Sequence, residues 1–152
     1  MRNLVLGFLA SLLSLQAADA TAPILWTNAD MARIQKEMAG KMDPARHLGT
    51  ARPSDSILMV HRDGPSEAEI HQKEADFILV KDGEGTVLVG GTLLESRVDR
   101  PTELRGKPGT GGKLYELKTG DMLYVPANTV HQFLVAPGKT FTAIIVKITP
   151  VP

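Results

Sequence analysis

The sequence predicts an all-β domain, a sandwich or barrel, preceded by one short helix. From residue 56 onward, short runs of β-branched and apolar residues alternate with turn residues at close spacing. The 152-residue chain also contains 14 Gly and 10 Pro with only 5% aromatic residues, which is typical of small folds with many turns. A hydrophobic fraction of 43% excludes global disorder.

Residues 1–20 have the pattern of a secretory signal peptide. Arg2 supplies the positive start, and residues 4–15 form an uncharged apolar run of 12, shorter than the ~20 residues that a spanning helix needs. Ala18-Asp19-Ala20 offers a small-x-small cleavage site, so Thr21 is the expected mature N-terminus. The alternative is a buried helix or an uncleaved anchor. We expect a periplasmic or secreted protein with no membrane contact after signal removal.

The next segment is expected to hold one amphipathic helix and a connection. Thr27 or Asn28 can cap a helix over residues 29–39, and Gly40 would end it. The polar stretch 41–54 is interpreted as a connecting segment. The apolar side chains of the helix form one stripe, suited to packing on a larger body or on a second copy in a homodimer: Met31, Ile34 and Met38.

Nine strands are expected after this connection. Turn signals separate them, and Asp82-Gly83-Glu84-Gly85 is interpreted as a hairpin turn between two of them. The chain therefore divides into a signal peptide (1–20), a helix with its connection (21–55) and a β-domain (56–152). The expected strands cover residues 56–62, 68–71, 76–81, 86–89, 93–98, 113–117, 122–125, 129–135 and 140–148.

Residues 100–112 are the one long stretch without a strand pattern. They contain four glycines and two prolines, and we expect a mobile flap here. Glu103, Arg105 and Lys107 offer charges that can close over an open site. The alternative is a solvated excursion without a role.

Charge and cysteine content exclude several classes of protein. The chain has 17 basic and 17 acidic residues, whereas nucleic acid or an anionic membrane surface as main partner requires a basic surplus. No cysteine is present, so disulfides, thiolate metal sites and cysteine nucleophiles are ruled out.

Two of the four histidines lie in regularly spaced patterns. Glu69 and His71 are two positions apart, so on a strand they face the same side, roughly 7 Å apart. Asp76 begins the next strand after a short turn. His131 follows a Pro-Ala-Asn turn in the stretch 120–131, G-D-M-L-Y-V-P-A-N-T-V-H, and can approach the other three side chains from across a barrel.

The stretch 64–83, which contains Glu69, His71 and Asp76, and the stretch 120–131 resemble the two motifs of the cupin superfamily, and the likeness covers about residues 56–148. Gly120, Pro126 and His131 are in register with the second motif, and Asn128 stands where the family usually has Gly. Asn tolerates the same left-handed conformation. The resemblance implies a single cupin jelly-roll β-barrel whose metal ligands come from neighbouring strands and point into its mouth.

The ligand set implied by the resemblance is Glu69, His71, Asp76 and His131. Glu69 occupies the place of the first family histidine, and Asp76 stands where Glu is usual. Two imidazoles and two carboxylates suit Mn, Fe(II) or Zn. Without the shorter Asp76, the other three still form a two-histidine, one-carboxylate triad. The alternative is a barrel that has lost its metal; His61 is interpreted as a rim or structural residue and His47 as solvated.

Two classes of function remain open. The first is a metal-dependent oxygenase, isomerase, epimerase or lyase acting on a small organic molecule, with Glu69 or Asp76 as a candidate general base. The second is a non-catalytic periplasmic module that binds a sugar or carboxylate. Tyr124 and Phe133 are expected to pack in the barrel and line its pocket. The fold alone does not decide between the two classes.

Overall fold

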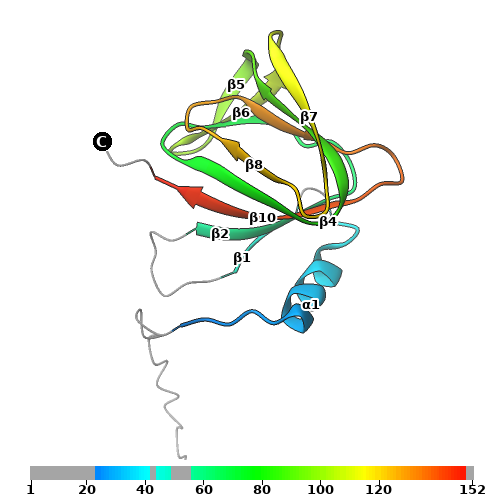
Figure 1. The fold of residues 1–152 in the computed structure, drawn as a ribbon. Coiled ribbons are helices and arrows are strands. Elements are labelled where there is room, and N and C mark those ends of the chain that lie inside the picture. The colour runs from blue at the N-terminus through cyan, green and yellow to red at the C-terminus, as the bar shows by residue number, and fades with distance from the viewer. Residues whose placement is uncertain (1–22, 42–43, 49–55, 150–152) are drawn as a thin grey trace, which may run out of the picture.

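A computed structural model describes residues 23–41, 44–48 and 56–149, so the expected signal peptide lies outside the described residues. Within these ranges the chain forms one helix and ten strands (Figure 1). The elements are α1 (Asn28–Met38), β1 (Ala45–His47), β2 (Ser56–Arg62), β3 (Ala68–His71), β4 (Ala75–Gly90), β5 (Leu93–Arg100), β6 (Glu103–Pro108), β7 (Gly112–Lys118), β8 (Met122–Val125), β9 (His131–Leu134) and β10 (Phe141–Ile148).

The strands form two antiparallel sheets that share β4. Sheet A has the order β1-β2-β10-β4-β8. Sheet B has the order β5-β6-β3-β9-β4-β7. The first half of the 16-residue β4 pairs in sheet A and its second half in sheet B, so the two sheets are one curled surface. The prediction of an all-β, barrel-type fold with a short N-terminal helix is confirmed.

β4 passes without interruption through the segment where a hairpin turn was expected, so that expectation is wrong. Gly83 has a φ of +83°, and a Cβ there would lie 2.0 Å from the backbone oxygen of Thr140. The pairing of β4 with β10 shifts its register close by, between Thr142 and Ala143. The glycine therefore marks the corner at which β4 leaves sheet A for sheet B and passes close to another strand.

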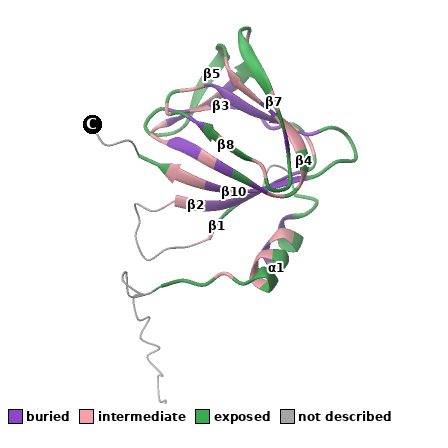
Figure 2. Ribbon diagram, viewed as in Figure 1, coloured by how far each residue is buried: buried purple, intermediate pink, exposed green. Residues whose placement is uncertain are grey.

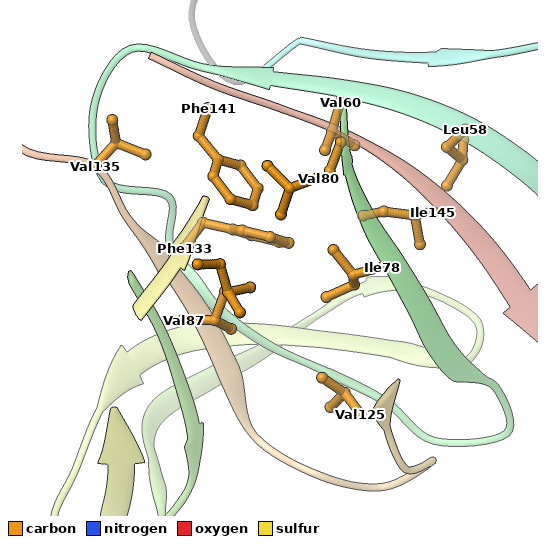
Figure 3. Close-up of a cluster of buried hydrophobic side chains, with 12 residues drawn as sticks. Leu58, Val60, Ile78, Val80, Val87, Val125, Phe133, Val135, Phe141 and Ile145 are labelled. Atoms are coloured by element: carbon orange, nitrogen blue, oxygen red, sulfur yellow. The ribbon is translucent and has the colours of Figure 1, made fainter. Parts of the chain in front are cut away.

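The hydrophobic core lies between the two sheets (Figure 3). Alternate residues of the strands point inward, as the period of two requires. Phe133 from sheet B and Phe141 from sheet A pack against each other with ring centroids 5.6 Å apart and the ring planes tilted by 47°. Val60, Ile78 and Val80 pack around them. Phe133 is one of the core residues that also border the polar site described below.

α1 packs on the outer face of sheet A. Thr27 caps the helix in a capping box with Asp30, which confirms Thr27 as the N-cap. Ile34 and Met38 are buried against Met59 of β2. The remainder of the helix surface is mostly exposed (Figure 2). No helix among the described residues has the length and apolar character needed to cross a membrane.

The segment 100–112 is not an irregular flap, and that prediction is wrong. Six of its residues form β6, which pairs with β3 on one side and β5 on the other, while its first residue ends β5 and its last begins β7. Gly106 is needed because a Cβ there would lie 2.4 Å from the backbone oxygen of Leu94. The glycine thus permits close strand approach beside the irregular β5–β6 pairing, and Pro108 is the last residue of the strand.

A second correction concerns the connection between the helix and the β-domain. β1 pairs with β2 at the edge of sheet A, within the stretch interpreted as a connection. Its three residues are all exposed, so no alternation of apolar and polar residues signals the strand.

Candidate metal centre

Four buried polar side chains from three strands meet at the mouth of the barrel. Glu69 and His71 lie on β3 and point to the same side, because they are two residues apart. His131 begins β9 and is the direct cross-strand partner of Glu69 in sheet B. Asp76 lies near the start of β4, where that strand belongs to sheet A. Strand pairing thus brings together residues that are 62 positions apart (69 and 131), and the curvature of the sheet adds Asp76.

The four side chains direct two nitrogens and two oxygens toward one another. His131 Nε2 lies 3.3 Å from Glu69 Oε1 and 3.5 Å from Asp76 Oδ2. His71 Nε2 lies 3.8 Å from the same Glu69 oxygen and 3.5 Å from the same Asp76 oxygen. Ligand atoms of Glu69, His71 and His131 all lie within 4.8 Å of one another.

This arrangement of donors fits a divalent metal ion. Metal–ligand bonds of about 2.1 Å place neighbouring donors roughly 3.0 to 3.4 Å apart for octahedral and tetrahedral geometry, close to the separations seen here. In the part of the chain that the structure describes, His131 Nε2 and Asp76 Oδ2 are buried polar atoms without a hydrogen-bond partner. Such atoms are costly to bury, and an ion between them would satisfy both.

A cation holds the outer oxygen of each carboxylate. Glu69 Oε2 lies 2.7 Å from Arg105 Nη2, and Asp76 Oδ1 lies 2.6 Å from Lys147 Nζ. Both cations are largely buried. Each carboxylate therefore has one oxygen in an ion pair and its other oxygen facing the two imidazoles.

The outer ring nitrogens of both histidines face acceptors. His131 Nδ1 lies 3.2 Å from the backbone oxygen of Thr129, to which it can donate. His71 Nδ1 lies 3.4 Å from Glu103 Oε2. A proton on Nδ1 leaves the Nε2 lone pair free for an ion, which is the usual arrangement of metal-binding histidines.

The acidic side chains are held in the ionised form. Burial raises the pKa of Asp76 and of Glu69, but the facing imidazoles and the nearby cations outweigh burial, so both pKa values lie below their ordinary range. The pKa of Glu103 is lowered in the same way. Burial raises it, but His71 and Arg105 outweigh burial and lower the pKa to about 2. At neutral pH all three are carboxylates.

The histidines are shifted in the opposite direction. Burial lowers the pKa of His131, but the carboxylates of Asp76 and Glu69 outweigh it and raise the pKa to about 9. The pKa of His71 also rises, because Asp76 and Glu103 outweigh burial. Without an ion, protons therefore balance the charge of the carboxylates at neutral pH.

A cavity of about 110 Å³ adjoins these donors. Its volume corresponds to a few water molecules at about 30 Å³ each, so it admits only a small molecule. One part of its wall is apolar and another cationic. The Arg62 guanidinium lies 5.5 Å from the centroid of the Phe133 ring. The apolar lining comprises Ala45, Leu58, Val60, Phe133 and Ile145.

Solved structures share this architecture. Hydroquinone 1,2-dioxygenase from a Sphingomonas species, with 4-hydroxybenzoate bound, is 15% identical with a TM-score of 0.56, over 76% of this chain and 72% of that one. A cupin protein from Bacteroides fragilis is 14% identical with a TM-score of 0.50, over 73% and 79%. The chain has the cupin fold.

Other comparisons limit what this likeness shows. Drosophila melanogaster CENP-C bound to CAL1 is 13% identical with a TM-score of 0.51, over 68% of this chain and 69% of that one. No protein-family model and no curated protein matches the sequence. Because similar folds occur in an enzyme and in a protein bound to another protein, the likeness shows the fold and not the activity.

Within this cupin fold, the structure brings together all four predicted ligands, and neither His47 nor His61 belongs to the group of donors. His61 is buried elsewhere, with Nδ1 2.8 Å from Thr142 Oγ1, which agrees with a structural role. His47 is exposed on β1, as expected, although it also borders the cavity. Asn128 has a φ of +58°, the left-handed conformation that its place in the motif requires.

Tyr124 does not line the pocket, and that expectation is wrong. Leu123 and Val125 are the inward residues of β8, so the period of two turns Tyr124 outward. Its side chain is 52% exposed on the outer face of sheet A.

The sequence interpretation missed one residue of the site and misplaced two. Lys147 was not singled out, although it shares the inward face of β10 with Phe141, Ala143 and Ile145, and a lysine in that series is a detectable signal. Glu103 and Arg105 were assigned to a mobile flap. They are fixed parts of β6 beside β3.

Proposed function

We propose that this protein is an exported, metal-binding cupin that holds Mn, Fe or Zn and binds or acts on a small organic molecule. Glu69, His71 and His131 are the proposed ligands, and Asp76 Oδ2 is the fourth donor. The observation that carries the proposal is the convergence of two imidazole nitrogens and two carboxylate oxygens, including the unpartnered His131 Nε2, beside a cavity.

The protein side chains have clear roles in such a site. A bound divalent ion would polarise an oxygen atom of a ligand as a Lewis acid. Glu69 and Asp76 have lowered pKa values, which makes them weak bases and favours them as ligands over general bases. Phe133 and its apolar neighbours would exclude water from one side of the organic molecule. Arg62 supplies positive charge to the cationic part of the cavity wall.

A second candidate is a ligand-binding module with a vestigial metal site. The ion pairs of Lys147 with Asp76 and of Arg105 with Glu69 favour it, because each already satisfies one carboxylate oxygen without an ion. In that case the raised pKa of His131 keeps a proton in place of the metal. The cavity would then serve binding alone.

Metal content and a single substitution test the proposal. We expect protein produced in medium containing Mn, Fe and Zn to hold about one ion per chain, because the four donors surround one position. His131→Ala should lose most of this metal, since it removes a central donor, while the far-UV circular dichroism of the β-fold stays unchanged. Elemental analysis of both proteins is the measurement.

His61→Ala serves as the control, because His61 is buried in contact with Thr142 and does not line the cavity, unlike its neighbours Val60 and Arg62. Folded wild type without stoichiometric metal would favour the vestigial site. Loss of metal in the His61 variant as well, at equal folding, would contradict the assigned ligands.

A further inference from the structure

The pairing of β6 with β3 places two charged residues directly behind two of the proposed ligands. Arg105 is the cross-strand partner of Glu69, and Glu103 is the partner of His71. Direct partners in an antiparallel pair have Cβ atoms about 5 Å apart on the same face. The register of one strand pair therefore sets a second layer of side chains around the proposed metal.

Arg105 connects these two pairs. Its Nη2 lies 2.7 Å from Glu69 Oε2 and 2.8 Å from Glu103 Oε1, and its Nε donates to the same Glu103 oxygen at 2.8 Å. The other oxygen of Glu103 lies 3.4 Å from His71 Nδ1. The Arg105 side chain is only 14% exposed. One guanidinium thus contacts a ligand carboxylate directly and a ligand imidazole through Glu103.

We infer that Arg105 is a positioning residue for the metal centre, an inference that rests on the proposed function. The planar guanidinium holds Oε2 of Glu69, so that only Oε1 turns toward the histidines. It also holds Glu103 where that carboxylate accepts the Nδ1 proton of His71, which leaves His71 Nε2 as the donor. Lysine cannot fully replace Arg105, because its single ammonium group lacks the several coplanar N–H donors of a guanidinium.

A purely electrostatic role and a positioning role of Arg105 predict opposite changes in metal affinity when Arg105 is replaced. A cation near a metal centre repels a divalent ion, so a purely electrostatic role predicts tighter metal binding without it. A positioning role predicts weaker binding, because Glu69 and Glu103 lose their fixed orientation. Loss of an outer partner typically weakens metal affinity 10- to 100-fold. The sign of the change therefore distinguishes the two roles.

The experiment measures Zn²⁺ affinity by chelator competition and the visible spectrum of the Co²⁺-loaded protein, which reports ligand number and geometry. We expect Arg105→Met to bind Zn²⁺ about 10- to 100-fold more weakly than wild type and to have an altered Co²⁺ spectrum. Arg105→Lys should give a smaller loss. Arg105→Lys also keeps the charge, so it provides the test should the methionine variant not fold.

The matched control is Arg97→Met. Arg97 is the cross-strand partner of Arg105 on β5 and forms a similar two-bond pair with Glu67, at 2.8 and 2.7 Å, but both of these side chains are about half exposed. We expect its affinity and Co²⁺ spectrum to match those of wild type. Equal or tighter Zn²⁺ binding by a folded Arg105 variant, with an unchanged spectrum, overturns the inference but leaves the proposed function intact. Wild type that binds no metal overturns the proposed function, and the inference with it.

Discussion

At His131, burial and neighbouring charge act in opposite directions. The ring is almost fully buried, which alone would favour its neutral form, yet two carboxylates face Nε2 and raise its pKa to about 9. A metal ion needs the neutral ring, so binding must release this proton. The proton and the ion therefore compete for the same nitrogen.

This competition predicts that metal affinity rises with pH. The folded pKa of His131, about 9, is above the ordinary value of about 6.5. The proton therefore stabilises the metal-free fold fully below about pH 6.5, and this stabilisation is lost as the pH rises through about 9. We expect the apparent Mn²⁺ affinity, measured by titration calorimetry, to increase from pH 6.5 toward pH 9, by up to about tenfold per unit for each proton released. A flat profile between pH 6.5 and 8.5 would contradict proton displacement.

Lys147 has an equally specific role in the metal-free protein. Its ammonium is the ion-pair partner of the outer oxygen of Asp76, whose carboxylate is 1% exposed. Lys147→Met would leave a buried charge without its cation, which typically costs about 3 kcal/mol or more. We expect urea unfolding of the metal-free variant to show a loss of this size.

Lys139→Met is the matched control for that substitution. Lys139 pairs with Glu84 at 2.7 Å, but both side chains are more than half exposed, so no measurable loss is expected. Equal stability of the two variants would show that Lys147 does not carry the charge balance of Asp76.

Single side chains of the site differ in how far the sequence predicts them. The spacing of Glu69 and His71 is enough to predict that they face the same side, because side chains two positions apart on a strand lie on one face. Asp76 and His131 required the motif resemblance, since His131 arrives through a long-range strand pairing and Asp76 through the curvature between the two sheets. Arg105 was associated with the site through its charge, but its fixed contact depends on a strand that was not expected.

At the scale of elements, the strands with clear alternation and clear turn residues were predicted best. β2, β3 and β8 have the expected bounds. The errors all concern glycine or exposure: Gly83 and Gly106 serve close strand contacts instead of turns or loops, and β1 has no buried face. A glycine signals that space or an unusual φ is needed, but a tertiary contact decides which.

The corner of β4 provides a test of that explanation. Gly83→Ala adds a Cβ that would lie 2.0 Å from the Thr140 oxygen at a φ of +83°, so strand movement is required. We expect a loss of about 3 kcal/mol or more in the free energy of unfolding, which combines strain and displaced backbone.

Gly120→Ala separates the two contributions. Its φ is +94°, but nothing lies within 4 Å of the added Cβ, so only conformational strain of about 1–2 kcal/mol is expected. Equal losses in both variants, measured by urea unfolding, would contradict a steric role for the Gly83 corner.

At the scale of the whole molecule, the proposed export depends on residues 1–20. The positive start, the short apolar run and the Ala18-Asp19-Ala20 site predict cleavage before Thr21. We expect N-terminal sequencing of protein from the periplasm or medium of a native host to begin at Thr21. A cytosolic product that begins at Met1 would contradict export.

The whole fold was predictable because many local signals agreed. Short strands, frequent turns and two motif-like stretches all indicated one β-domain of barrel type, and the sharing of β4 between both sheets is consistent with it. A homodimer through α1 remains a prediction that sedimentation velocity can test. Its apolar stripe already packs on sheet A through Ile34 and Met38, which leaves the exposed side for any partner.

The position of Asp76 on β4 has one further consequence. Asp76 belongs to the sheet A half of that strand, whereas Glu69, His71 and His131 lie on sheet B. An ion held by all four would cross-link the two layers of the barrel at its mouth. Its binding should therefore slow amide hydrogen exchange in β3, β9 and the start of β4 together, and slow exchange much less in β7, which carries none of the four side chains. The same four side chains would then hold the two sheets together where β3 and β4 meet.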